Sequence, residues 1–367
     1  MADEAGNREA FRIQRFYCAQ MAAPIYARMC GVIADRLTAD SETGRRVLGW
    51  SGEPTRDALP LRLVGGLHAL VQAGRDADLT RVFAGEVTDE ERIAAILSRV
   101  FGEHDAWLLP WLDGPPQTNE PGRSAALMTG LMTVAARHGP RLELLEIGSS
   151  AGLNLLIDRY RFDLGGTLVG PMGAPVMIRP EWRGDAPDFV PLAIVGVRGC
   201  DIQPLDATDP AVEARLAAYV WAEAPERQAR LRAAIAMQRE RGIRLDRADA
   251  ADWVEARLAE PQPSGVTRVL MHSVVWQYLP TASADRIRAA MLAAGERADA
   301  DRPLAWVMME PDRASARQLV QVRSWPGDGG WQVVASAHAH GAWIEPGAPM
   351  TDGETIALPD AALRGGA

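Results

Sequence analysis

A carboxylate and several small residues follow an apolar segment near the middle of the chain, in the stretch EIGSSAG from Glu146 to Gly152. The apolar run LELL before it predicts a buried strand, and SAGLNLLIDRY after it predicts a helix. Ligands of open α/β sheets bind at such a strand end. We expect Gly148 to let the backbone approach a cofactor without a clashing Cβ, and Gly152 to let the helix pack close to the strand. Glu146 would meet a positively charged or hydroxylated group.

Two further predicted strands also end in carboxylates. Asp201 follows the apolar run LAIVGVRGC, and Asp249, followed by Ala250, ends the run IRLDRA. A carboxylate at the position of Asp201 can accept two hydrogen bonds from ribose hydroxyls, and Asp249 could meet an adenine amino group. Because parallel strands end at one edge of a sheet, all three acids are expected around a single ligand.

His272 and Tyr278 are the first candidates for groups that act on a substrate. His272 ends the predicted strand TRVLM, and Tyr278 lies on the turn that follows. A histidine titrates near neutral pH, so His272 could act as a base or orient the substrate. The alternatives are a structural hydrogen bond for His272 and a packing role for Tyr278.

A polar loop, QTNEPGR, precedes the helix SAALMTGLMTVAARH. Its residues Asn119, Glu120 and Arg123 are candidates for reading a substrate, because loops placed by a rigid scaffold often carry recognition. The alternative is a helix cap in which Glu120 and Arg123 pair in solvent. Asn154, on the helix predicted after the glycine loop, could line the same pocket.

The remaining histidines suggest structure rather than chemistry. His338 and His340 would alternate on one strand and face the same side, but no third ligand stands at a telling spacing, so no metal site is predicted. His68 lies in the apolar helix LVGGLHALV and is expected to be a hydrogen-bonded core residue.

The elements that would position these residues predict an α/β fold. Residues 1–138 show three- and four-residue apolar spacing, which predicts an all-α N-terminal domain covering the site. Residues 139–350 alternate apolar runs with amphipathic helices, which predicts a doubly wound, mostly parallel, seven-stranded sheet with a C-terminal antiparallel hairpin at PGDGG. An insertion is expected at 162–191 and a loosely ordered tail at 351–367.

Composition limits the partners and the compartment. The net charge of −9 over 367 residues disfavours nucleic acid and anionic membrane surfaces, so a small-molecule substrate is expected. Three scattered cysteines form no disulfide or zinc pattern, which favours the reducing cytoplasm. The charged N-terminus and the lack of a long apolar run predict neither a signal peptide nor a membrane span.

The E-x-G-x-x-x-G loop, the G-x-D-x-x-P strand end and the D-A strand end, in this order and with a terminal hairpin, resemble class I S-adenosylmethionine-dependent methyltransferases. The resemblance covers roughly Arg141–Trp343 and implies a Rossmann-like domain that binds S-adenosylmethionine. Ser150 stands where the usual middle glycine of the loop would be. The resemblance makes Glu146, Gly148 and Gly152 the cofactor loop, Asp201 the ribose acid and Asp249 the adenine-side acid. Further expected cofactor contacts are Ser149, Ser150, Asn154 and Ala250.

The whole chain also resembles a bacterial family of uncharacterised proteins, number 2332 among the domains of unknown function. The stretches QTNEPGR, EIGSSAGLNLLIDRY, RGCDIQPLD, MHSVVWQYLP and HGAW carry this second resemblance.

The leading functional hypothesis, from the first resemblance, is a methyltransferase with a small-molecule acceptor. Two alternatives stay open: an NAD(P)-dependent oxidoreductase on a related fold, and a non-catalytic protein that kept the methyltransferase fold. The loop from Glu146 to Gly152 lacks the G-x-G spacing with which dinucleotide-binding loops contact a pyrophosphate, which argues against the oxidoreductase.

Overall fold

The computed structural model describes residues 3–312, 315, 317–327 and 329–347. The tail at 351–367, predicted to be loosely ordered, lies outside these residues. The chain divides into two compact units, which we call the helical unit (residues 1–118 and 208–232) and the sheet unit (residues 119–207 and 233–367). Among the residues described, none of the helices combines the length and apolar character that crossing a membrane would require.

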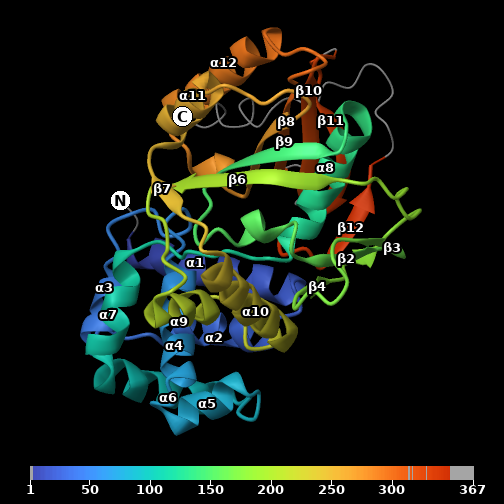
Figure 1. Ribbon diagram of the computed structural model, residues 1–367. Helices are drawn as coiled ribbons and strands as arrows, with labels where there is room; N and C mark the ends of the chain where they lie inside the picture. Colours follow the sequence, from blue (N-terminus) through green and yellow to red (C-terminus); the bar gives the residue numbers. More distant parts are fainter. Residues whose placement is uncertain (1–2, 313–314, 316, 328, 348–367) are drawn as a thin grey trace. The chain divides into compact units, whose positions relative to one another are not determined.

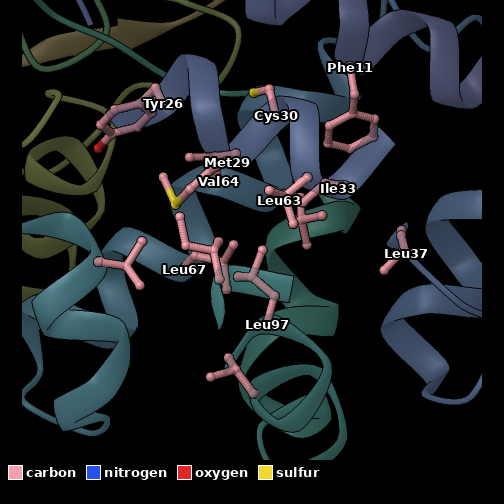
Figure 2. Close-up of a cluster of buried hydrophobic side chains, with 14 of the residues drawn as sticks. Phe11, Tyr26, Met29, Cys30, Ile33, Leu37, Leu63, Val64, Leu67 and Leu97 are labelled. Atoms are coloured by element: carbon pink, nitrogen blue, oxygen red, sulfur yellow. The ribbon is translucent and has the colours of Figure 1, made fainter. Parts of the chain in front are cut away.

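The helical unit is held together by helices whose apolar faces meet in one core. Leu59, Leu63 and Leu67 recur at a spacing of four residues and are fully buried, which is the expected pattern of a core-facing helix. Figure 2 shows this cluster, with side chains from several helices pointing toward one another. The helices of the unit are α1 (Glu4–Gln20), α2 (Pro24–Arg36), α3 (Glu42–Leu48), α4 (Leu59–Gln72), α5 (Ala77–Phe83), α6 (Glu90–Glu103), α7 (Asp105–Asp113), α9 (Pro210–Ala218) and the start of α10 (Pro225–Arg241).

The sheet unit contains a large mixed sheet in the order β5-β12-β11-β10-β9-β8-β1-β6-β7 (Figure 1). Five neighbouring strands, β9 to β7 in this order, are parallel, and three antiparallel pairings follow from β9 to β12. The strands are β1 (Arg141–Ile147), β5 (Glu181–Trp182), β6 (Ala193–Asp201), β7 (Leu245–Arg247), β8 (Thr267–Ser273), β9 (Leu304–Asp312), β10 (Arg317–Trp325), β11 (Gln332–Ala337) and β12 (Trp343–Pro346).

The mixed α/β class, the mostly parallel sheet and the antiparallel hairpin of β10 and β11 are confirmed, and Gly329 in the hairpin turn has φ +66°. The prediction of seven strands was wrong, because the sheet has nine. The two extra strands, β12 and β5, are short and pair at the edge through tertiary contacts. The segment predicted as an insertion forms β5 and a small sheet of β2 (Arg161–Leu164), β3 (Thr167–Val169) and β4 (Met177–Ile178).

Helices cover both faces of the large sheet. Helix α8 (Arg123–His138) packs on β9, β10 and β11, and so closely that a Cβ on Gly130 would lie 2.5 Å from Val307 Cγ1. Helices α11 (Ala250–Ala259) and α12 (Thr281–Glu296) lie side by side and pack with Trp306, which points to the opposite face from Val307 (Figure 1). Helix α8, placed by the sequence analysis in the N-terminal domain, belongs to the sheet unit.

The prediction of an α-helix after the glycine loop was wrong. The segment forms only a short 3₁₀ helix, η1 (Leu153–Leu156), preceded by Gly152 at φ +74°. The Tyr160 hydroxyl donates to the Leu153 carbonyl at 2.7 Å, an oxygen that a continuing α-helix would use for its own backbone. Tertiary hydrogen bonds have therefore overridden the helical spacing of this segment.

Candidate functional site

The three acidic strand ends lie at the same edge of the sheet. In the parallel register Ile147 pairs with Cys200 and Asp201 pairs with Arg247, so β1, β6 and β7 end side by side. Burial raises the pKa of the Cys200 thiol, and the negative charges of Asp201, Asp246, Glu146 and Asp249 raise it further. These acids therefore surround one buried thiol. The strand order also reverses between β1 and β8, which makes this edge the topological switch point of the sheet.

Glu146 is buried at this edge with half of its carboxyl group unsatisfied. Its side chain is 1% exposed, and its Oε1 accepts a hydrogen bond from Asn154 Nδ2 at 3.2 Å. Asn154 is held in turn by Ser124, whose Oγ donates to Asn154 Oδ1 at 2.9 Å. Oε2 of Glu146 has no hydrogen-bond partner among the described residues. Burial raises the pKa of Glu146 to about 8, and the charge of Asp201 acts in the same direction.

The glycine loop is fastened by residues that the sequence analysis had placed in separate groups. Ser149 Oγ donates to the Glu146 carbonyl at 2.9 Å. Asn119 Oδ1 accepts from the backbone N–H groups of Ala151 at 3.2 Å and of Leu153 at 2.9 Å. Asn119, predicted to read a substrate, therefore lies against the glycine loop and holds its backbone.

Both loops that flank the switch point carry strained backbone. Ser150, after β1, and Val274, after β8, each have φ +54°, a region that residues with a Cβ rarely adopt. Ser150 is held there by its own N–H, which donates to Asp201 Oδ2 at 2.9 Å, while its buried Oγ has no partner in the described part of the chain. Strain of this kind clusters at functional sites.

Neighbouring side chains occupy the space where a Cβ of either loop glycine would lie. Gly148 has φ +66°, and a Cβ there would lie 2.4 Å from Cγ2 of Val275. The side of the turn that we expected to face a cofactor is thus filled by Val275. At Gly152 a Cβ would lie 3.2 Å from Gln238 Nε2 and 3.3 Å from Leu245. This glycine therefore makes room for neighbouring side chains, whereas we had expected it to let an α-helix pack close to β1.

Asp201 and Asp249 already hold backbone groups. Asp201 Oδ1 accepts from Gln203 N–H at 2.8 Å, so its two oxygens join the ends of the loops after β1 and β6. Asp249 is the N-cap of α11, which begins at Ala250, and its Oδ1 accepts from Ala251 N–H at 2.8 Å. A carboxylate offers about four acceptor sites, so each group can still accept a ligand hydroxyl or amino group.

His272 lies at the predicted strand end, but both of its ring nitrogens are used. Nε2 accepts from Trp306 Nε1 at 3.0 Å, since an indole can only donate. Nδ1 then carries the proton and donates to Glu310 Oε1 at 2.7 Å. The ring is fully buried and stacked on Trp276. This histidine therefore holds Glu310 and offers no ring nitrogen to a substrate, whereas Tyr278, on η2 (Trp276–Tyr278), is 69% exposed.

The remaining polar-loop residues are buried rather than paired in solvent. Glu120 Oε1 accepts from Gly122 N–H at 2.9 Å, and Arg123 Nε donates to the Ala339 carbonyl at 3.0 Å. Their side chains are 4% and 8% exposed. Arg123 therefore joins the loop before α8 to the turn after β11, whereas Glu120 holds the backbone of its own loop.

The expectation that His338 and His340 share a strand face was wrong. Strand β11 ends at Ala337, and both histidines lie in the turn before β12, where His340 N–H donates to His338 Nδ1 at 3.1 Å. In the described ranges they join no group of three side chains able to hold a metal ion.

Glu310 is a residue that the sequence analysis missed. Besides His272, its Oε1 accepts from the N–H groups of Val275 at 3.0 Å and of Trp276 at 3.3 Å. Glu310 thus fixes the loop after β8, from which Val275 reaches the Gly148 turn. The available signal was the position of Glu310 near the end of the apolar run LAWVMME, beside the strand that ends in His272.

The comparisons with known proteins identify a family and no activity. A family model described as "Uncharacterized protein conserved in bacteria (DUF2332)" matches residues 8–345. No curated protein and no solved structure matches the chain. Because the family model spans almost the whole sequence, the chain belongs to this bacterial family.

Proposed function

We propose that this protein is an S-adenosylmethionine-dependent methyltransferase that acts on a small-molecule acceptor. The observation that carries the proposal is Glu146: a fully buried carboxyl group at the switch point, with one oxygen lacking a partner in the described residues and a pKa of about 8. A buried acceptor without a partner costs free energy, and a ligand that supplies a positive charge or a donor removes that cost.

The residues at the site fit this cofactor through their acids. S-adenosylmethionine carries positive charge at its ammonium and sulfonium groups, which a carboxylate such as Glu146 would balance. The acids Asp201 and Asp249 stand at the ends of the next two strands, where hydroxyl and amino groups of an adenosyl ligand could donate to them. The buried Ser150 Oγ, without a partner in the described ranges, adds a second polar atom at the same loop.

The chain's own contribution would be binding and alignment. When bound, S-adenosylmethionine supplies an electrophilic methyl group. Asn119 and Asp201 hold the loop after β1 in its strained conformation, so that little reorganisation accompanies binding. Tyr278 is the exposed group next to the switch point that could orient an acceptor. His272 supports this arrangement through Glu310 and takes no proton from the acceptor.

One structural observation bears on each of the two alternative functions, the oxidoreductase and the non-catalytic protein. The oxidoreductase requires a helix N-terminus for the pyrophosphate of its dinucleotide, and the loop after β1 leads only into the short 3₁₀ helix η1. The non-catalytic protein is favoured by Val275, which fills the Gly148 turn that the resemblance assigns to the cofactor. It is therefore the second candidate.

Thermal shift measurements with S-adenosylmethionine, S-adenosylhomocysteine, NAD and NADP test the proposal. A ligand at a hundredfold excess over its Kd stabilises the native state by about 2.7 kcal/mol, and we expect this from the two adenosyl ligands only. Asp201→Ala should abolish the shift, while the exposed Asp252→Ala should preserve it. A shift with only NAD or NADP would refute the methyltransferase, and no shift with any ligand would support the non-catalytic protein.

A further inference from the structure

The sheet unit contains a cavity apart from the site described above. It encloses about 110 Å³ and is lined by Trp276, Trp306 and Trp331, with Glu310 among the polar residues. Neighbouring indole rings lie 5.4 Å and 5.1 Å apart, inclined by 63° and 60°. Three indole rings line this small space, and aromatic walls suit a planar guest.

Glu310 provides the polar group of this cavity. Its Oε1 is used by the donors from His272, Val275 and Trp276, whereas its Oε2 has no hydrogen-bond partner among the described residues. The residue is 5% exposed. The cavity therefore contains a buried acceptor that an N–H donor of a guest would satisfy.

The charges that line the cavity and its volume further limit the kind of ligand that it could hold. Arg288 and Arg323 also line the cavity, and the Arg288 guanidinium lies 5.1 Å from the centre of the Trp276 ring. Two guanidinium groups favour a neutral guest over a cation. A cavity of about 150 Å³ holds benzene, so this one has room for a five-membered ring. The 40% exposed Leu292 and the half-buried Trp331 mark the side from which a guest would enter.

We infer that the cavity of Trp276, Trp306 and Trp331 is a binding site for a small neutral heteroaromatic ring with an N–H group, of the azole class. The ring packs against the indole walls, and its N–H donates to Glu310 Oε2. This inference does not rest on the methyltransferase proposal, because none of its residues belongs to the acid set of Glu146, Asp201 and Asp249.

Titration of the full chain with pyrazole, and with imidazole at pH 8.5 where it is neutral, tests the inference by ligand-observed NMR. We expect saturable millimolar binding of both. Glu310→Gln, which replaces the free acceptor oxygen by an amide, should weaken binding about tenfold or more. Trp331→Leu should weaken it by about tenfold. Trp343→Leu, a half-buried tryptophan on β12 outside the cavity, should leave binding unchanged, and circular dichroism verifies that each variant is folded.

Three outcomes would overturn the inference. The first is no binding of either azole up to tens of millimolar. The second is furan or thiophene, which lack an N–H group, binding as tightly as pyrazole and equally well to Glu310→Gln. The third is preferential binding of methylguanidinium, which would make the site one for a planar cation.

Discussion

His68 of the helical unit and Glu146 of the sheet unit are both buried, ionisable and neutral near pH 7, yet their surroundings differ. His68 Nδ1 donates to the Ala218 carbonyl at 3.0 Å, and Nε2 lies 3.3 Å from the Gln72 amide nitrogen that donates to it. Glu146 satisfies one oxygen and leaves the other without a partner in the described residues. A satisfied buried group is explained by the fold alone, whereas an unsatisfied one needs a further explanation, and for Glu146 we propose a ligand.

The backbone around the two groups differs in the same way. His68 lies within a regular helix, α4, and stacks on Phe83 at 5.1 Å. Glu146 leads into a loop in which Gly148 and Ser150 both have positive φ. At the switch point, backbone strain and a buried group without a partner in the described residues therefore occur in the same segment.

The largest loss of stability is expected from Gly148→Ala. A Cβ would be strained by the positive φ and would lie 2.4 Å from Val275 Cγ2, so we expect the free energy of unfolding to fall by about 3 kcal/mol or more. Gly242→Ala, with φ +65° and no atom within 4 Å of the new Cβ, should cost about 1 kcal/mol. Urea denaturation measures both. Adding Val275→Ala should recover most of the difference, and equal costs for the two glycines would show that Val275 does not fill the turn.

A smaller loss is expected from His68→Phe. The new ring keeps the stacking on Phe83 but removes the donor to the Ala218 carbonyl and one of the two acceptors of the Gln72 amide, at a cost of about 2 kcal/mol. Hydrogen exchange of α4 measures this locally. An unchanged protection of α4 would mean that the His68 hydrogen bonds contribute little, and the contrast with Glu146 would disappear.

His68→Phe should also change how the free energy of unfolding depends on pH in acid. Burial lowers the pKa of His68 from 6.5 to about 4, so the unfolded chain binds more protons between these values and the stability falls as the pH drops through this window. The slope from this residue is at most about 1.4 kcal/mol per pH unit. His68→Phe should remove that part of the slope, as measured by urea midpoints from pH 7 to pH 4.

Glu146→Gln should have the smallest effect on the free energy of unfolding near pH 5, and it should stabilise the protein at high pH. The pKa of Glu146 is raised from 4.5 to about 8, so the folded chain binds more protons in this window and wild-type stability falls as the pH rises through it. We expect the variant to match the wild type near pH 5 and to exceed it at pH 8.5. The exposed Glu296→Gln should show no such difference, and a destabilised Glu146→Gln at pH 8.5 would mean that the carboxylate is already satisfied.

The sequence predicted those parts of the site that depend on apolar runs and strand ends. The apolar runs of β6, β1 and β8 form adjacent parallel strands, so Glu146 and Asp201 lie at one edge of the sheet, as the strand ends predicted. The helix predicted after Gly152 and the strand predicted through His338 did not form, and side-chain hydrogen bonds occupy backbone groups in both segments. Asn119 and Tyr160 take the backbone groups that a helix would have used. The contact of Val275 with Gly148 depends on how two loops fold together, which local spacing does not encode.

The pH dependence of S-adenosylmethionine affinity tests the central claim most directly. Between pH 6 and 7.5 the Glu146 carboxyl group must lose its proton to balance a cation, so calorimetry should show the affinity rising with pH, by at most about tenfold per unit. Glu146→Gln should bind more weakly and without this rise, and 5′-methylthioadenosine, which lacks the charged amino-acid end, should bind wild type independently of pH. A pH-independent affinity for S-adenosylmethionine, or the same rise in Glu146→Gln, would contradict the assignment of Glu146 to a cationic ligand.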